Sequence, residues 1–264
     1  MPRITANGIR IDYELSGPPG APVVTLSHSI ATDSRMWEPQ VEALAPHFRV
    51  LRFDTRGHGG TDAPPGPYSL EQLAEDANAL LEALGIDQTH FVGLSMGGMI
   101  GQMLALTRPK RLSSLTLCDT SARMPPEMRP EWDARIQTTL TAGMEAHVEP
   151  TITRWFTSGF IENRPDVVDS VRALIRETDV QGYVGCCRAI QELDLLDRLP
   201  EIRLPTLVIV GRDDPATPVE AAQAIHRQIV GSQLVVVESA SHLSNLEQPE
   251  AFNHALLAFL GKVG

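Results

Sequence analysis

The sequence predicts an α/β protein with a mostly parallel central sheet covered by helices on both faces. Short apolar runs alternate with helical patterns through the first part of the chain, and the same alternation returns near its C-terminal end. The segment between them carries helical patterns and no strong strand. Because alternating strands and helices are typical of a parallel sheet, we predict a core domain from residues 1–120 and 196–264. Residues 121–195 are expected to form a helical cap inserted into it.

Two local signals mark the ends of elements. Apolar and polar residues alternate on both sides of Asn7-Gly8, which is typical of a hairpin joining two short strands. Ser69 and Gln72 have the spacing of a capping box, and the apolar positions that follow recur as in a helix.

The remaining elements follow from hydrophobic periodicity. Short apolar runs predict buried strands, and apolar residues that recur every three or four positions predict helices. The predicted strands are residues 22–27, 48–54, 90–94, 112–119, 205–211 and 233–238. The other predicted helices are residues 36–47, 96–106, one through 167–175 in the cap, one after residue 211 and a last one through 252–260.

The composition limits the partners of the chain. Lys plus Arg number 22 and Asp plus Glu 33, which gives a net charge of −11. Nucleic acids and anionic membranes are bound through basic patches, so neither is expected as a partner. The N-terminus lacks a signal pattern and no apolar run approaches ~18 residues, so we expect a cytoplasmic protein. Cys118, Cys186 and Cys187 are expected to be buried small hydrophobic residues, and no cofactor motif or metal-ligand spacing is present.

Residues 93–97, Gly-Leu-Ser-Met-Gly, lie between a predicted strand and a predicted helix. A serine hydroxyl is a weak nucleophile at neutral pH and needs a neighbouring base. The G-x-S-x-G pattern in this context is typical of a nucleophile elbow, in which the turn leaves room only for glycine two residues to either side. The sequence therefore predicts Ser95 as a nucleophile, with an idle serine in a glycine-rich turn as the alternative.

Two downstream sites favour the nucleophile. Asp213 and Asp214 follow the strand that ends at Gly211, and His242 follows the next strand. Residues at the C-terminal ends of parallel strands share one edge of the sheet, so these side chains are expected near Ser95. We predict a triad in which His242 accepts the Ser95 proton and one of the two aspartates orients the imidazole.

Acyl transfer also requires donors for an oxyanion, usually two backbone N–H groups. One is expected from Met96, directly after the nucleophile, and the other from Ile30, in the loop after strand 22–27. In that loop His28 has two open interpretations, contact with substrate or bracing of the loop. Residues 53–62 are expected to form a loop fixed by an Asp54–Arg56 network.

Taken together, these segments resemble the α/β-hydrolase superfamily, and within it 3-oxoadipate enol-lactonase of aromatic catabolism. The spacing of Asp214 from Gly211 and Pro218 matches the G-x-x-D-x-x-x-P usual in that fold, which favours Asp214 over Asp213. Ser29 departs from the glycine, and His28 from the asparagine, found in many relatives. The matching stretches are LSHSIATDSRMW, LRFDTRGHGGTDAPPGPYSLEQLAED, GLSMGGMIG, RWFT, PTLVIVGRDDPATP and ASHLSNLEQPEAF.

The resemblance implies a serine hydrolase that opens a small carboxylate-bearing enol-lactone with water and without a cofactor, forming 3-oxoadipate. A cation near the cap would then bind the substrate carboxylate; Arg154, Arg135 and Arg188 are candidates, each with a surface ion pair as its alternative. Trp132 and Trp155 are expected to line the pocket or to pack within the cap. A carboxylesterase, a carbon–carbon bond hydrolase and a noncatalytic binding module are the other functions considered, and a homo-oligomer is compatible with the sequence.

Overall fold

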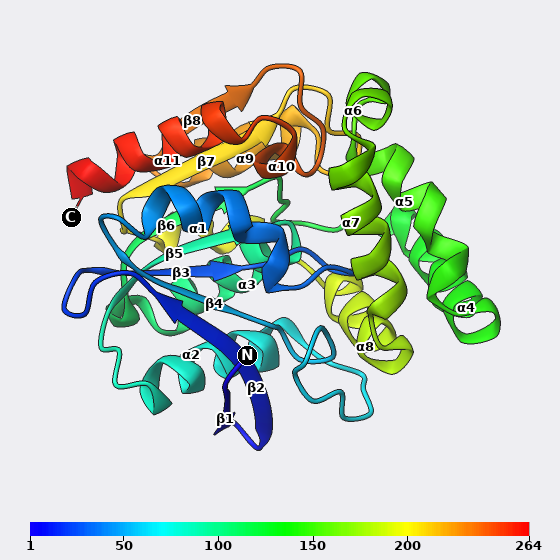
Figure 1. The fold of residues 1–264 in the computed structure, drawn as a ribbon, viewed down its shortest axis with the longest axis horizontal. Coiled ribbons are helices and arrows are strands. Elements are labelled where there is room, and N and C mark those ends of the chain that lie inside the picture. Colours follow the sequence, from blue (N-terminus) through cyan, green and yellow to red (C-terminus); the bar gives the residue numbers. More distant parts are fainter. Residues whose placement is uncertain (264) are drawn as a thin grey trace.

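The computed structural model of the chain, which describes residues 1–263, has an eight-stranded sheet at its centre (Figure 1). The strand order is β1-β2-β4-β3-β5-β6-β7-β8. β2 pairs antiparallel with β1 and with β4, and all the other neighbours are parallel. The strands are Arg3–Ala6, Ile9–Ser16, Val23–Ser27, Arg49–Phe53, Thr89–Leu94, Leu112–Cys118, Thr206–Gly211 and Gln233–Val237.

The hairpin turn between β1 and β2 lies where the sequence predicts it. Asn7 has φ 46° and Gly8 has φ 77°, so both residues adopt the left-handed conformation that a type I′ turn requires. Its register places Ala6 opposite Ile9.

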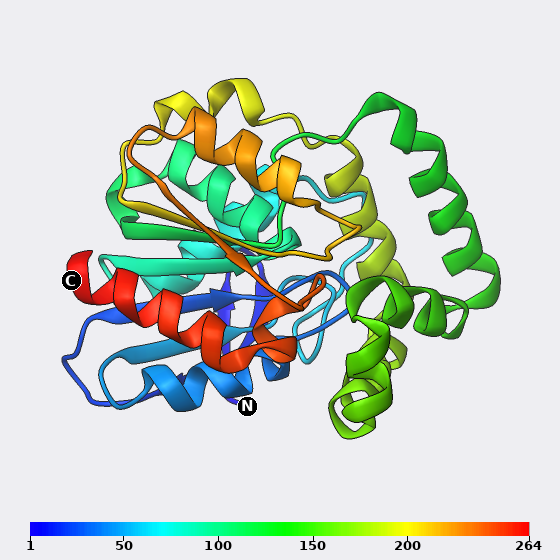
Figure 2. The ribbon, with the colours of Figure 1, turned by 90° about the horizontal axis from the view of Figure 1, so that it is seen from above.

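Helices cover both faces of the sheet (Figure 2). On one face α1 (Glu38–Leu44) packs beside α11 (Pro249–Val263), and α2 (Leu70–Ala83), α3 (Met96–Thr107) and α9 (Val219–Gln228) cover the other. The predicted cap of α2 forms, because the Ser69 hydroxyl accepts the Gln72 N–H at 3.2 Å.

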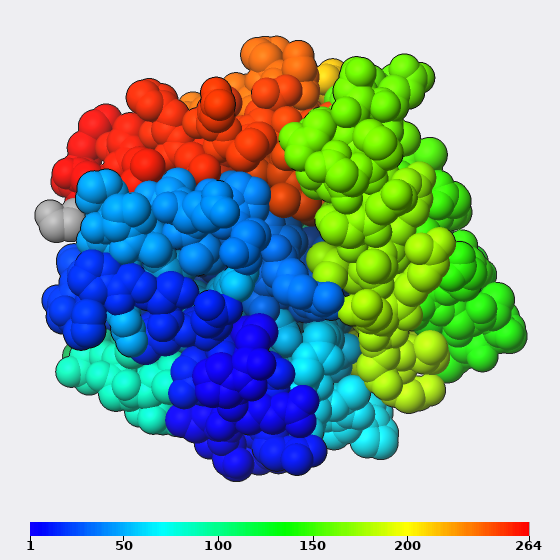
Figure 3. All heavy atoms as spheres, viewed as in Figure 1, coloured from blue at the N-terminus to red at the C-terminus, as the bar shows by residue number. Residues whose placement is uncertain are grey.

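Between β6 and β7 the chain forms a helical segment beyond the C-terminal ends of the parallel strands (Figure 1). In the space-filling view this segment, green to yellow-green, occupies one side of the molecule (Figure 3). Within the described residues this stretch contains no strand, only an isolated bridge between Arg123 and Asp194. The apolar periodicity predicted through 167–175 is the buried face of α7. The helices of the segment are α4 (Arg129–Ala142), α5 (Val148–Trp155), α6 (Ser158–Asn163), α7 (Pro165–Glu177) and α8 (Val180–Gln191).

The predicted fold class is confirmed, and the ends of the predicted strands differ from the observed ones by at most one residue. The parallel strands all end at the edge of the sheet that faces the helical segment (Figure 2). Cys118, Cys186 and Cys187 are free and buried. In residues 1–263 no helix combines the length and apolarity needed to cross a membrane.

Candidate active site

Ser95 occupies a strained turn between β5 and α3. Its backbone has φ 55° and ψ −115°, a conformation that residues other than glycine rarely adopt. Two contacts hold it there: the Ser95 N–H donates to the Cys118 carbonyl at 2.9 Å, and the Thr120 hydroxyl donates to the Ser95 carbonyl at 2.7 Å. The strained backbone conformation of Ser95 is therefore held by residues at the end of the neighbouring strand, β6.

The glycines around Ser95 are required by space. A Cβ at Gly93 would lie 2.1 Å from the Gly97 carbonyl oxygen, and one at Gly97 would lie 2.0 Å from the Ser27 carbonyl oxygen. Neither backbone can move away, because Ser27 belongs to β3 and Gly97 to α3. The G-x-S-x-G pattern thus allows β3, β5 and α3 to meet closely at Ser95.

Asp214 and His242 form a buried pair. The Asp214 Oδ2 atom lies 2.8 Å from His242 Nδ1, and the two residues are 3% and 2% exposed. The Ala216 N–H and the Thr217 N–H and hydroxyl also donate to the carboxylate, at 2.6–3.1 Å. Burial favours the protonated form of Asp214, but His242 and the Thr217 donors outweigh it and hold its pKa below the usual value. Asp213, the alternative acid in the sequence, is exposed.

Residues 241–247, which we call the histidine loop, are held by three buried carboxylates. Besides the Asp214 pair, Glu247 Oε2 accepts the Ser241 N–H at 2.8 Å, and Asp119 Oδ2 accepts the Ser244 hydroxyl at 2.5 Å. These carboxylates come from the loop itself and from the ends of β6 and β7. The position of His242 therefore depends on several parts of the fold.

Asp119 connects this loop to the sheet. It follows β6 with φ 43°, and its Oδ1 accepts the Gly211 N–H at 2.7 Å. Burial and the nearby negative charge of Asp214 raise the pKa of Asp119 well above its usual range. Asp119 and Glu247 were not identified from the sequence as site residues. For Asp119 a signal was present, because a carboxylate at the end of a buried strand is unusual.

Glu247 also joins the histidine loop to the helical segment. Its Oε1 accepts the Thr157 N–H at 2.9 Å and the Thr157 hydroxyl. Beside this contact the Leu243 N–H donates to the Trp155 carbonyl at 3.2 Å. The Trp155 ring then lies against the His242 ring, with centroids 5.7 Å apart. The helical segment thus contacts His242 directly.

The loop after β3, residues 28–36, will be called the β3 loop. Among the described residues 1–263 the Ile30 N–H has no hydrogen-bond acceptor, and Met96, as the first residue of α3, has no acceptor in the preceding turn of that helix. Both residues are buried, at 5% and 0% exposure. Ser29 needs no glycine conformation; the left-handed residue of the loop is Ala31, with φ 58°.

His28 is buried inside the β3 loop. Its Nδ1 lies 2.7 Å from the Ser29 carbonyl oxygen, and its Nε2 lies 2.8 Å from the Thr55 N–H. With no exposed surface and both ring nitrogens bound to backbone, His28 has no polar atom left for a substrate. These contacts favour the bracing interpretation over the contact with substrate.

The segment 53–62 is fixed by two separate interactions instead of the expected Asp54–Arg56 network. Asp54 accepts the Ser34 and Gly60 N–H groups at 3.0 and 2.9 Å. Arg56 instead forms a buried ion pair with Asp76 at 2.6 Å.

The arginines expected near the pocket differ in their partners. Arg154 pairs with Glu131 at 3.1 Å and Arg188 with Asp133 at 2.6 Å, all partly or largely exposed. Arg135 has no carboxylate partner within residues 1–263.

The Arg135 guanidinium instead lies over two aromatic rings, 5.2 Å from the centroid of Trp132 and 6.0 Å from that of Tyr183. The structure thus places Arg154 in a surface ion pair, Trp155 against His242, and Trp132 beside the unpaired Arg135.

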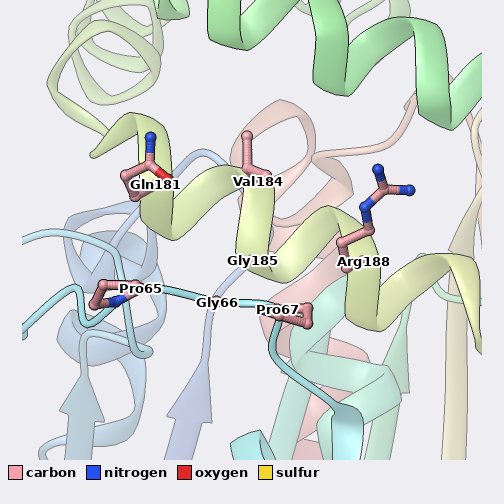
Figure 4. A pocket seen from close by; sticks show the side chains of 7 residues that line it. All are labelled: Pro65, Gly66, Pro67, Gln181, Val184, Gly185 and Arg188. Carbon is pink, nitrogen blue, oxygen red and sulfur yellow. The ribbon is translucent and has the colours of Figure 1, made fainter.

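A groove of about 300 Å³ lies between the loop 65–67 and α8 (Figure 4). Of the residues predicted for the site only Arg188, a candidate for the substrate carboxylate, lines it, and none of the predicted triad or oxyanion-hole residues does. No group of three His, Cys, Asp or Glu side chains suited to a metal ion occurs in the described part of the chain. The groove is lined by Pro65, Gly66, Pro67, Gln181, Val184, Gly185 and Arg188.

The family model described as alpha/beta hydrolase fold matches residues 22–249. 3-Oxoadipate enol-lactonase 2 of Acinetobacter baylyi is 39% identical, over 97% of this chain and 95% of that protein.

Two solved structures are similar over nearly the whole chain. The enol-lactonase from Burkholderia xenovorans LB400 has a TM-score of 0.95 and 40% identity, over 98% of this chain and 100% of that one. A thermophilic esterase from Thermogutta terrifontis, described as malate bound, has a TM-score of 0.93 and 34% identity, over 99% and 98% of the two chains.

Proposed function

Because the chain belongs to the alpha/beta hydrolase fold family, we propose that it is a serine hydrolase that opens a small carboxylate-bearing enol-lactone, 3-oxoadipate enol-lactone, to 3-oxoadipate. The observation that carries the proposal is the buried Asp214–His242 pair, 2.8 Å apart, at the sheet edge where Ser95 is held in a strained turn. The similarity to enol-lactonases of two organisms supports the substrate class.

In the proposed mechanism Ser95 attacks the lactone carbonyl and His242 accepts its proton. Asp214 accepts the Nδ1–H of His242, so Nε2 carries the lone pair that acts as base. The negative charge that develops on the carbonyl oxygen is stabilised by the N–H groups of Ile30 and Met96.

Collapse of this intermediate breaks the bond to the ring oxygen, which leaves as an enol after taking the proton from His242. The enol then forms the ketone, so the leaving group is a good one. A water molecule, deprotonated by His242, attacks the acyl-enzyme and releases the second carboxylate and Ser95. The net reaction adds one water to the lactone and needs no cofactor.

The substrate keeps one free carboxylate throughout, and we propose Arg135 as its partner. An arginine without a carboxylate partner loses no ion pair when it binds an anion, and stacking on Trp132 and Tyr183 limits the positions of its guanidinium. Arg154 and Arg188 would each have to exchange an existing partner.

The test of the function compares substrates and the nucleophile variant. The enol-lactone should be preferred over neutral aryl esters by orders of magnitude in kcat/KM, and Ser95→Ala should abolish turnover of both while the circular dichroism spectrum is retained. Preference for the aryl esters would indicate a carboxylesterase, a function that the similarity to the Thermogutta terrifontis esterase also supports. A folded protein that neither turns over esters nor labels at Ser95 with a fluorophosphonate would indicate a noncatalytic binding module.

The arginine assignment is tested with a matched pair of variants. Arg135→Gln should raise KM for the enol-lactone about 10- to 100-fold, since a hydrogen bond between charged groups contributes about 1.5–3 kcal/mol. Arg154→Gln, which removes a guanidinium from the same segment, should change KM less than about twofold, because an exposed ion pair contributes little. Neutral aryl esters should not distinguish the two variants, and an equal effect of both on the lactone would refute the assignment.

A further inference from the structure

We propose that His28 and His58 act together as positioning residues that hold the peptide of Ile30 in place as an oxyanion donor. This inference rests on the proposed function, in which the Ile30 N–H binds the oxyanion. Neither histidine contacts the substrate in this proposal. They act through the backbone on both sides of Ile30.

The hydrogen bonds fix the protonation of both rings. The Thr55 N–H donates to His28 Nε2 at 2.8 Å, and the Ala31 N–H donates to His58 Nε2 at 3.0 Å. A nitrogen that accepts an N–H carries no proton, so each ring has its proton on Nδ1. There His28 donates to the Ser29 carbonyl at 2.7 Å and His58 faces the Arg56 carbonyl at 3.3 Å.

Both rings are therefore neutral, and their surroundings favour this state. His28 is 0% and His58 1% exposed, and the ring centroids are 5.3 Å apart. Burial lowers the pKa of both imidazoles, to about 3 for His58, where the neighbouring His28 lowers it further.

The two rings grip the residues that flank Ile30. His28 holds the carbonyl of Ser29, the group joined to the Ile30 nitrogen, and His58 holds the N–H of Ala31, the next peptide. Ala31 has φ 58°, a conformation unfavourable for a residue with a side chain, and the hydrogen bond to His58 helps to offset this cost. Between these two fixed peptides the Ile30 N–H is left without an acceptor in residues 1–263.

The experiment distinguishes the effect of losing the hydrogen-bond acceptor at position 58 from the effect of changing the volume of the side chain. His58→Leu removes the acceptor for Ala31, and His58→Gln replaces it with an amide oxygen. His58→Leu should lower kcat for the enol-lactone about 10- to 100-fold with KM within twofold, because a displaced oxyanion donor affects the transition state. His58→Gln should recover most of this loss.

A boronic acid that forms a tetrahedral adduct with Ser95 gives a second readout. Its affinity should fall in parallel with kcat in His58→Leu and return in His58→Gln, since one adduct oxygen occupies the oxyanion position. At position 28, the amide of asparagine lies at the distance of Nδ1 and can donate to the Ser29 carbonyl, whereas the amide of glutamine lies one carbon further out, at the distance of Nε2, so His28→Gln should have the lower kcat.

The control is His90→Gln, which replaces a buried histidine that bonds the Ser114 hydroxyl at 2.8 Å and should leave kcat and boronate affinity unchanged. The inference is overturned if folded His58→Leu keeps wild-type kcat and boronate affinity, or if His58→Gln, which is the variant more suited to folding, loses as much as His58→Leu. An inactive wild-type protein would instead refute the proposed function, so the two failures are distinct.

Discussion

The β3 loop and the histidine loop both contain buried histidines, but the groups that bond the ring nitrogens of these histidines differ. In the β3 loop His28 bonds only to backbone, on both sides of its ring, with His58 beside it. In the histidine loop His242 faces the Asp214 carboxylate, and the carboxylates of Asp119 and Glu247 bond residues close to it. The ring nitrogens of His28 are thus held by neutral backbone groups, and Nδ1 of His242 by an acid.

This difference indicates what each loop is suited to do. An imidazole with both nitrogens bound to backbone is held in one position and cannot exchange a proton without losing a hydrogen bond. An imidazole with one nitrogen on a carboxylate has its other nitrogen available as a base, and the carboxylate stabilises the cation that forms. Burial alone therefore does not distinguish a structural histidine from a catalytic one; the partners of the two nitrogens do.

The largest expected effect comes from removing the charge that faces His242. Asp214→Asn should lower kcat about 10³- to 10⁴-fold, because an asparagine can present an N–H to Nδ1 and stabilise the wrong tautomer. The fold should survive, since the backbone donors of Ala216 and Thr217 can still reach the amide oxygen. Steady-state kinetics measure the loss. Asp213→Asn is the matched control, and a comparable loss there would contradict the proposed role of Asp214.

Glu247 and Asp119, two of the acids that hold the histidine loop, should differ in their contribution to the free energy of unfolding. Glu247 accepts bonds from the Thr157 N–H and hydroxyl and from the Ser241 N–H, so Glu247→Gln turns an N–H donor toward one of them and should cost about 1–3 kcal/mol of unfolding free energy.

Substitution of Asp119 should have the smaller effect, because the raised pKa of its carboxyl already favours the protonated, neutral form. In Asp119→Asn the amide oxygen can accept the Gly211 N–H and the amide nitrogen can donate to Ser244, so the loss should stay below about 0.5 kcal/mol. Urea unfolding at neutral pH compares the two variants. An equal loss would show that both carboxylates act as anions.

The sequence predicts much of this site because the catalytic residue types lie at strand ends. Ser95, Asp214 and His242 each follow a predicted strand, and a parallel sheet brings such residues to one edge. The hairpin at Asn7-Gly8 and the cap at Ser69 were predictable for a different reason: they are local features whose partners are close in sequence.

The contacts that support the site could not be predicted from the sequence, because their partners are distant along the chain and are often backbone groups. Asp119 bonds Ser244, 125 residues away, and His58 bonds the amide of Ala31, which no side-chain pattern reveals. Whether Arg135 or Arg154 lacks a partner depends on how α4 and α5 face each other, which hydrophobic periodicity does not determine.

The last expected effect is the response of stability to acid, which has opposite signs for His58, which bonds the β3 loop, and Asp119, which bonds the histidine loop. His58 has a folded pKa of about 3 against 6.5 as its ordinary value, so between these pH values the unfolded chain binds more protons than the folded one. Its contribution is present above about pH 6.5 and is lost as the pH falls, by about 2 kcal/mol between pH 6.5 and 4.5. Asp119 has a raised pKa, so it instead weakens the fold as the pH rises above the ordinary carboxyl range.

His58→Gln should therefore flatten the acid side of the stability curve, and Asp119→Asn should flatten the side toward neutral pH. Thermal unfolding followed by circular dichroism from about pH 4.5 to 8 measures both slopes. If the melting temperature of His58→Gln falls toward acid as steeply as that of the wild-type protein, other groups are responsible for the acid sensitivity. The contrast between neutral and acidic support would then have to rest on the hydrogen bonds alone.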